Sequence, residues 1–512
     1  MRRALRNIGR LLRIAWTLGR WDALFLLSDY GLVPAVTFLA GMAPRKRGLG
    51  SPGRRLAGAF QALGPSFIKF GQALSTRPDL VGEEIAAELS ALQDRLPPFD
   101  AKAARAIVES EFGVPLDSLF REFTDEPVAA ASIAQVHFAV TAAGEPVAVK
   151  ILRPGVERAL ERDLELFYWL AEIAERALPS WRRLRPVEVI RTFAQSVMVE
   201  MDLRFEAAAA SELRQNFAED EGFLVPAVDW RRTSRRVLTL ERVEGIPIDE
   251  RDALVAAGHD PHAVLGKAAG AFFNQIFRDG FFHADLHPGN LLVDAEGNVV
   301  AVDFGIMGRL DAQTRRYLAE MLLGFLIGDY ERVAEVHFEA GYVPRRTSKA
   351  AFVQALRSIG EPILGRPLNE ISIAQLLGQL FQITEAFEME TQPQLLLLQK
   401  TMLMAEGLTR RLTPDQNMWV FTRPLIERWA RENLGVQARV RDAAEELLEA
   451  AGRLPRLAAR AERAFDGLEA GVSLSPDTLE AMSGRRRGGS ALPLLLAVIA
   501  ALLAGLLAVQ LL

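Results

Sequence analysis

One segment near the middle of the chain, FFHADLHPGNLLVDAEGNVVAVDFG at residues 281–305, constrains the fold most strongly. It holds two short apolar runs on either side of a polar turn at residues 296–298, which predicts a β-hairpin. Asp285 and Asn290 precede this hairpin, and Asp303 follows it. Because a hairpin brings the chain back beside its own beginning, we expect Asn290 and Asp303 to lie next to each other.

The spacing of these three side chains favours phosphoryl transfer. This reaction needs a carboxylate near the attacking oxygen, oxygen ligands for Mg²⁺ and cations on the phosphates. Asp285 fits the first role and Asn290 and Asp303 fit the second, so we expect ATP and Mg²⁺ at this site. The same order and spacing are typical of the catalytic loop and DFG segment of protein kinases. A His/Asp metal site or a surface turn is the alternative, and we expect His283 to form structural hydrogen bonds.

A second predicted hairpin, upstream, carries the expected phosphate-binding lysine. Apolar residues alternate at residues 136–140 and 147–151, and the second run contains VAVK, with Lys150 in the position of the kinase lysine that binds the α- and β-phosphates. Only seven of the 60 basic residues are lysines, so a lysine on an apolar strand indicates a need for a compact ammonium. An edge lysine with its charge in solvent is the alternative.

The glycine-rich phosphate loop of ordinary kinases is absent from this sequence. In its place stands PVAAASIAQVH, whose alanines adopt positive φ only at a cost and whose methyl groups hinder close approach of the backbone to phosphate. Nucleotide can still bind, but we expect its triphosphate to lie in a different position from that in an ordinary kinase. The predicted nucleotide-contacting residues are Ala129, Ala130, Ala131, Ser132, Ile133 and Ala134 in this loop, Lys150, and Glu241 and Val243 in a hinge-like segment after a predicted strand at 236–241.

At these motifs the chain resembles the UbiB family of atypical, protein-kinase-like proteins, over about residues 63–302. LGPSFIKFGQALSTRPDL resembles the family's KxGQ motif, EMDLRFEA resembles its ExD motif, and the alanine-rich loop is the family's replacement for the glycine-rich one. The motif residues are Lys69, Gly71 and Gln72 in the first and Glu200 and Asp202 in the second. The resemblance implies that Glu206 forms an ion pair with Lys150. It also implies that the KxGQ segment covers the active site where a protein kinase would admit its peptide.

The resemblance further implies that Lys69 meets the acids of the ExD motif and adds a fixed cation beside Asp303. This arrangement would block peptide entry, and the chain after residue 305 has neither an APE motif nor a long activation loop. We therefore expect ATP hydrolysis, or phosphorylation of a small or lipid-like molecule, rather than protein phosphorylation. The predicted catalytic residues are Asp285, Lys150, Lys69 and Glu206, the predicted metal ligands are Asn290 and Asp303, and the remaining KxGQ and ExD residues are predicted to regulate the site.

The family is linked to ubiquinone biosynthesis, so the resemblance implies an ATPase or atypical kinase that acts on polyprenylphenol precursors or on the biosynthetic complex. The expected partners are membrane lipid such as cardiolipin, prenylated quinone precursors and other quinone-biosynthesis proteins. Direct hydroxylation is not favoured, because the sequence has no GxGxxG strand–turn–helix for flavin and no cysteine or clustered histidine for iron. The alternatives are a small-molecule kinase of the aminoglycoside or choline type and a nucleotide-regulated pseudokinase scaffold.

Both ends of the chain are predicted to contact a membrane. Residues 491–512 carry no charge and as a helix would extend about 33 Å, against about 30 Å for a hydrocarbon core. Arginines at 485–487 precede them and indicate that the kinase-like part faces the cytoplasm at a bacterial inner membrane, with the mitochondrial inner membrane as the alternative. The N-terminal arginines lie at helical spacing opposite Leu12 and Trp16, so this helix either lies on an anionic membrane or docks on the protein. The net charge of −5 argues against nucleic-acid binding.

Together these patterns predict an α+β, protein-kinase-like two-lobed fold with an N-terminal helical extension, a helical C-terminal region and one C-terminal transmembrane helix. Helical patterns cover residues 52–108, 156–178, 186–218, 262–279 and about 311–479. The predicted parts are the extension at 1–108, the kinase-like core at 109–345 with its small lobe at 109–243, the helical region at 346–480, a basic linker at 481–490 and the membrane anchor at 491–512.

Overall fold

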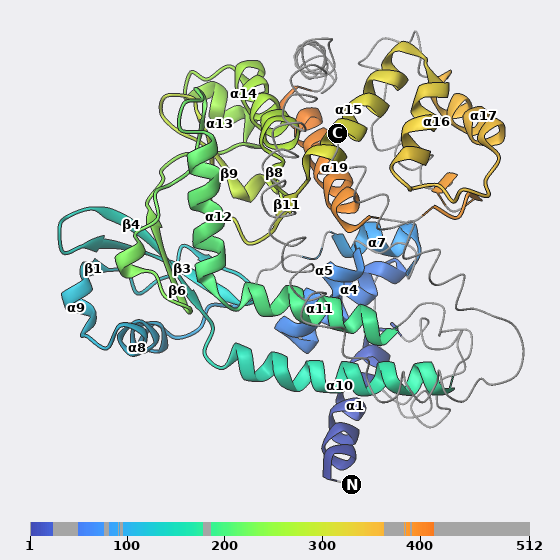
Figure 1. Cartoon of the computed structure of the whole chain (residues 1–512). Helices are drawn as coiled ribbons and strands as arrows, with labels where there is room; N and C mark the ends of the chain where they lie inside the picture. The colour runs from blue at the N-terminus through green and yellow to red at the C-terminus, as the bar shows by residue number, and fades with distance from the viewer. Residues whose placement is uncertain are drawn as a thin grey trace, which may run out of the picture. The chain divides into compact units, whose positions relative to one another are not determined.

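A five-stranded antiparallel sheet forms the small lobe (Figure 1). The computed structural model describes residues 2–23, 50–75, 81–90, 92, 96–177, 186–362, 383–384, 386–389 and 392–413. Four strands run in the order β1-β3-β4-β6, and β2 pairs with β3. The bounds are Phe120–Phe123 for β1, Ala129–Ala130 for β2, Ala134–Thr141 for β3, Pro146–Leu152 for β4 and Val237–Glu241 for β6. The hairpin predicted at residues 136–151 is confirmed as β3–β4, in which Val136 pairs with Lys150.

Two helices, α8 (Ala101–Phe112) and α9 (Leu116–Leu119), accompany this sheet. Ile107 of α8 shares a buried apolar cluster with Val149 of β4, and this cluster is separate from the main core. The predicted boundary at residue 108 therefore falls inside a helix that packs on the small-lobe sheet.

One helix of the predicted N-terminal extension, α5, packs against two long helices that follow β4 (Figure 1). The extension consists of α4 (Pro52–Leu63), α5 (Pro65–Ser75) and α7 (Glu83–Ser90), and the long helices are α10 (Val156–Ala177) and α11 (Pro186–Glu200). The ring of Phe70 lies 4.9 Å from that of Phe167 and 5.4 Å from that of Phe193, measured between centroids. This aromatic cluster joins α5 to α10 and α11.

The helix predicted at residues 186–218 is interrupted, which corrects the sequence-based expectation. Helix α11 ends at Glu200 and α12 (Leu203–Asn216) begins three residues later. The Asp202 side chain accepts a hydrogen bond from the backbone N–H of Arg204 at 3.2 Å and so caps the N-terminus of α12. The ExD motif thus stands at a junction between two helices.

The large lobe combines helices with short strands. Its helices are α13 (Arg251–Ala256) and α14 (Pro261–Phe273), and the helix predicted at 262–279 ends in a π-helical turn at Asn274–Asp279. Its strands are β5 (Phe223–Leu224), β7 (Ile246–Pro247), β8 (Phe281–His283), β9 (Leu291–Val293), β10 (Val299–Ala301) and β11 (Met307–Arg309), with a 3₁₀ turn at Pro288–Asn290. The 3₁₀ turn at Trp230–Arg232 contacts β6 of the small lobe instead. The hairpin predicted around the turn at residues 296–298 is confirmed as β9–β10, in which Leu292 pairs with Val300.

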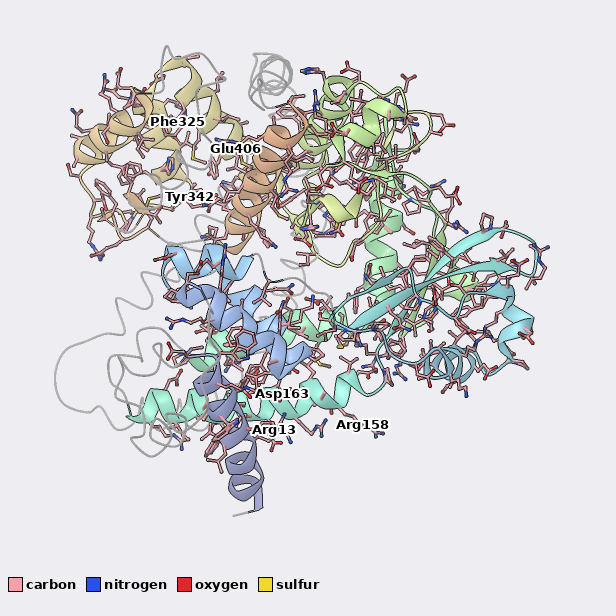
Figure 2. All side chains as sticks on the ribbon, turned by 180° about the vertical axis from the view of Figure 1, so that it is seen from behind. Arg13, Arg158, Asp163, Phe325, Tyr342 and Glu406 are labelled. Carbon is pink, nitrogen blue, oxygen red and sulfur yellow. The ribbon has the colours of Figure 1, made fainter. Side chains whose placement is uncertain are left out.

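The described C-terminal helices divide between two cores. Helices α15 (Ala312–Ile327), α16 (Tyr330–Glu339) and α17 (Lys349–Gly360) surround a cluster that includes Tyr330 and Phe352. Helix α19 (Pro393–Leu412) instead contributes Leu398, Leu408 and Leu412 to the main core, with the large lobe. Figure 1 shows α19 beside β8 and β11, and Figure 2 marks it by Glu406.

The N-terminal helix α1 (Arg2–Arg20) packs on α4 and reaches α10, where Arg10 forms an ion pair with Asp163. Figure 2 labels Asp163 on α10 and Arg13 on α1. Leu12 and Trp16 are exposed by 42% and 47%. The structure thus has the docked helix, and its contact with a membrane stays a prediction. Within the described segments, no helix is both long and apolar enough to cross a bilayer. The predicted linker and anchor at 481–512 lie outside those segments.

Candidate functional site

The predicted ion pair between Lys150 and Glu206 is present, and Asp303 joins it. Strand β4 supplies Lys150, helix α12 supplies Glu206, and Asp303 follows β10. The Lys150 Nζ lies 2.6 Å from Glu206 Oε1 and 3.3 Å from Asp303 Oδ2. The side chain of Glu206 is 8% exposed and that of Asp303 is 43% exposed. One ammonium therefore connects the small lobe, α12 and the DFG segment.

Burial and the neighbouring charges both shift the pKa values of these three side chains. Burial would lower the pKa of Lys150, but the negative charges of Asp303 and Glu206 outweigh it and hold that pKa above its ordinary value. Burial would raise the pKa of Asp303, but the Lys150 charge and the N–H of Gly305 prevail and hold it below its ordinary value. Burial raises the pKa of Glu206, with the Lys150 charge working against it. Lys150 is thus held as a shared cation.

The predicted catalytic loop is held together by His283, whose predicted structural role is consistent with the geometry. Its backbone N–H donates to the buried Gln275 side chain at 2.8 Å, and its Nδ1 accepts from the N–H of Asp285 at 3.2 Å. Its Nε2 donates to the backbone oxygen of Asp303. Burial lowers the pKa of His283, which favours the neutral ring that these bonds need.

Asn290 and Asp303 lie close together, as the hairpin predicts, because the N–H of Val302 donates to the backbone oxygen of Asn290 at 3.0 Å. The Asn290 amide nitrogen donates to the backbone oxygen of Asp285 at 3.0 Å, which leaves its Oδ1 for another partner. A carboxylate and an amide oxygen are ligands that Mg²⁺ accepts. These residues therefore fit Mg²⁺, which when bound would neutralise phosphate charge.

Lys69 of the KxGQ motif contacts one acid of the ExD motif. The Lys69 Nζ lies 2.8 Å from Glu200 Oε2, and these side chains are 9% and 14% exposed. The second acid differs from expectation: Asp202 forms its ion pair with Arg204, at 2.6 Å, besides capping α12. Glu200 therefore binds a lysine of the N-terminal extension, whereas Asp202 binds and caps the helix that carries Glu206.

The other two KxGQ residues are placed by helix packing. A Cβ on Gly71 would stand 2.6 Å from a ring carbon of Phe60 and 2.7 Å from a methyl carbon of Leu92, so glycine permits close contact of α5 with its neighbours. The backbone oxygen of Gln72 accepts a hydrogen bond from the Ser75 hydroxyl at 2.7 Å. Their predicted regulatory roles stay predictions.

The alanine-rich segment forms a tight turn between β2 and β3. The N–H of Ala131 donates to the oxygen of Ala134 at 2.8 Å, and Ser132 between them is fully buried. The Arg153 guanidinium donates two hydrogen bonds to the Ala131 oxygen, at 3.0 and 2.8 Å, and the Arg153 N–H donates to Ile133 at 2.8 Å. The turn is thus fixed by an arginine that the sequence analysis missed. Contact of residues 129–134 with nucleotide stays a prediction.

The hinge-like segment leaves β6 with two of its N–H groups already bonded. The N–H of Glu241 donates to the oxygen of Ala227 at 2.8 Å, and that of Arg242 donates to Pro146 at 3.1 Å. Adenine would therefore have to use the backbone oxygens of this segment or the N–H of Val243, which is half-buried. Adenine contact at Glu241 and Val243 stays a prediction.

Two protein families match this chain. The ABC1 atypical kinase-like domain matches residues 91–337, and the UbiB helical domain matches residues 356–417. A protein of Marinobacter nauticus named "Probable protein kinase UbiB" is 42% identical over 463 residues, which cover 88% of this chain and 84% of that protein. The chain belongs to the UbiB family. A relative of the same name in Azotobacter vinelandii is also 42% identical and covers 90% of this chain and 87% of that protein. The solved complex of Rv3197 with erythromycin, from Mycobacterium tuberculosis, is 23% identical, with a TM-score of 0.45, over 67% of this chain and 91% of that one.

The UbiB helical domain supplies a site residue that the sequence analysis missed. Lys400 of α19 places its Nζ 3.1 Å from Asp285 Oδ1, across 115 residues of sequence. The Lys400 side chain is 23% exposed and that of Asp285 is 30% exposed. No local motif marks Lys400, but the scarcity of lysine that drew attention to Lys150 applies to it equally. In this UbiB-family chain the two matched domains thus meet at the predicted catalytic carboxylate.

Proposed function

We propose that this UbiB-family protein binds Mg-ATP between its lobes and transfers the γ-phosphoryl group to water or to a small or lipid-like acceptor. The observation that carries the proposal is the position of Lys150, whose ammonium bonds to both Glu206 and Asp303. In kinase-type phosphoryl transfer this lysine binds phosphate, and it does so only when its glutamate partner is in place. Asp285 would receive the acceptor's proton, and Asn290 and Asp303 would hold Mg²⁺.

Two features support an acceptor other than a protein. The ion pair between Lys69 and Glu200 ties the helical extension to the end of α11, next to the helix that carries Glu206. The chain also passes from Gly305 through the short strand β11 to α15, which begins at Ala312, and Asp311 caps that helix. This connection leaves no room for the long loop on which protein kinases bind a peptide.

We further propose that the reaction supports ubiquinone biosynthesis at an inner membrane, with the catalytic part on the cytoplasmic side. Membership of the UbiB family supports the pathway, and the uncharged stretch at 491–512 behind three arginines supports the membrane. Prenylated quinone precursors are lipid-soluble, so a membrane-bound enzyme would meet them where they are. Anionic lipid such as cardiolipin and other proteins of the pathway are the expected partners.

The test is Mg²⁺-dependent ATP hydrolysis by the full chain in phosphatidylcholine liposomes, with and without cardiolipin and a phenolic quinone-precursor analogue. Asp303→Asn should lower turnover by about 100-fold or more, because it removes a metal ligand and a partner of Lys150. The matched variant Asp125→Asn changes a carboxylate that is 70% exposed and should leave turnover unchanged. A wild-type protein that binds nucleotide but turns over no faster than Asp303→Asn would contradict the proposal and favour a scaffold.

A further inference from the structure

The ion pair between Lys400 and Asp285 brings a cation to the place where phosphoryl transfer would occur. Within the described part of the chain, Lys400 is the one basic side chain that forms an ion pair with Asp285, with 3.1 Å between Nζ and Oδ1. Both side chains remain partly open to solvent. A buried structural pair would be closed to ligand, whereas this pair can exchange contacts with one.

The catalytic loop has no such cation of its own. Between Asp285 and Asn290 the sequence is Leu-His-Pro-Gly, without lysine or arginine. The ring of His287 is engaged as an acceptor, because the N–H of Gly289 donates to its Nδ1 at 3.1 Å. A positive charge beside the carboxylate must therefore come from another element, and α19 supplies it.

The other two lysines of the site already have carboxylate partners. Lys150 is shared between Glu206 and Asp303, and Lys69 pairs with Glu200. The phosphoryl group that leaves ATP carries negative charge on three oxygens, and cations must neutralise it during transfer. Lys400 is the lysine whose partner, Asp285, is the predicted proton acceptor rather than a metal ligand or a helix residue.

Helix α19 holds Lys400 at a fixed position on the large lobe. Leu408 and Leu412 are buried in the main core. The Arg251 side chain donates to the backbone oxygen of Leu412 at 3.0 Å, and Arg411 forms an ion pair with Asp249 at 2.8 Å. Because the helix is anchored at its C-terminal end, Lys400 moves mainly through its own flexible side chain.

We propose that Lys400 is a catalytic residue, whose ammonium binds the γ-phosphoryl oxygens of ATP and neutralises them during transfer. This assignment rests on the proposed function and adds a residue from the helical domain to it. The acceptor oxygen of water or an alcohol bonds to the γ-phosphorus while the bond to the β–γ bridging oxygen breaks. ADP leaves with that electron pair, and the acceptor's proton passes to the Asp285 carboxylate. Lys400 then contacts Asp285 in the empty site and phosphate in the loaded one.

The experiment compares two nucleotides that differ in the γ-phosphate. Dissociation constants for ADP and for a nonhydrolysable ATP analogue with an imido β–γ bridge are measured with Mg²⁺ on the full chain in liposomes. Lys400→Met removes the charge and keeps the length of the side chain. It should weaken binding of the ATP analogue about 10- to 100-fold, leave ADP binding within about twofold, and lower ATP hydrolysis at least as much. Lys400→Arg should retain part of the preference for the ATP analogue over ADP, because it keeps the positive charge.

Lys349→Met is the matched variant, since Lys349 lies on α17, is 51% exposed and pairs with Glu335. It should change neither dissociation constant nor turnover. If Lys400→Met weakens binding of both nucleotides equally, Lys400 has a structural role. If it speeds up hydrolysis, Lys400 blocks the site. Either result overturns the proposal. If the wild type hydrolyses ATP and Lys400→Met changes neither the dissociation constants nor the turnover, the assignment of Lys400 is overturned and the proposed function stands. A wild type that binds neither nucleotide removes the proposed function with it.

Discussion

The Lys69 side chain is largely buried, and its ion pair with Glu200 should dominate the effect on stability of changing either residue. Removing one member of a buried ion pair takes a close opposite charge from the other, which typically costs about 3–5 kcal/mol. Lys69→Met and Glu200→Gln should therefore each lower the free energy of unfolding by about 3 kcal/mol. The double variant should lose about 1–3 kcal/mol less than the sum of the two. Denaturant unfolding of all four proteins measures this coupling.

Strictly additive losses would contradict the prediction, because they would mean that the two side chains do not stabilise each other. Arg105→Met and Asp125→Asn offer the matched exposed pair, with side chains 36% and 70% exposed. Their changes should be small and nearly additive, since exposed ion pairs contribute about 0–1 kcal/mol.

At the residue scale, sequence reasoning reached those parts of the site that local patterns mark. Lys150 stands on a recognisable strand, and Asp285, Asn290 and Asp303 stand at fixed spacing around a hairpin. Lys400 has no such context, because its link to Asp285 spans 115 residues and depends on how α19 packs. A contact that only tertiary packing creates leaves no periodicity or spacing in the sequence.

At the scale of helices, two glycines with opposite surroundings provide a direct comparison. Gly71 in α5 is buried, and a Cβ there would overlap Phe60 and Leu92 at 2.6 and 2.7 Å. Gly407 in α19 is exposed, and a Cβ there would meet nothing within 4 Å. Gly71→Ala should destabilise the protein by about 1–3 kcal/mol through overpacking, whereas Gly407→Ala should stabilise it by about 0.5–1 kcal/mol through helix propensity.

Thermal unfolding of the full chain distinguishes these outcomes, because the two midpoints should move in opposite directions from the wild type. Gly71→Ala should also weaken nucleotide turnover more than Gly407→Ala, since α5 carries Lys69. Equal midpoints for the two variants would mean that α5 does not pack closely against Phe60 and Leu92.

The break between α11 and α12 shows why element boundaries are harder to predict than elements. Residues 186–218 carry a continuous helical pattern, and apolar positions continue through Met201. The structure ends the first helix at Glu200 because Asp202 satisfies the backbone N–H of Arg204 and starts a new one. Aspartate is a common N-cap, so the signal was present in the sequence. The prediction relied on the apolar period of 3.6 residues, and this period can continue across a junction at which the helix axis changes direction.

Across the whole molecule, three buried histidines tie stability to pH. Burial lowers the pKa of His137, His283 and His337 below the ordinary value of 6.5. Below pH 6.5 the unfolded chain therefore takes up protons that the folded chain refuses, so stability present above that pH is lost as the pH falls. Each histidine contributes at most about 1.4 kcal/mol per pH unit, or about 4 kcal/mol for three. The raised pKa of Glu206 acts in the opposite sense and offsets part of this loss.

The urea midpoint of the full chain should accordingly be lower at pH 5.5 than at pH 7.5. At His137 and His283 the hydrogen bonds add to this effect of burial, because each ring has one nitrogen that accepts a bond and would clash with its donor once protonated. His337 donates from Nδ1 to the backbone oxygen of Val333, and an asparagine amide can place a donor at the same position, so His337→Asn should remove about a third of the pH dependence. If the urea midpoint is no lower at pH 5.5 than at pH 7.5, these histidines are protonated in the folded protein. The assignment of His283 Nδ1 as the acceptor of the N–H of Asp285 would then be wrong.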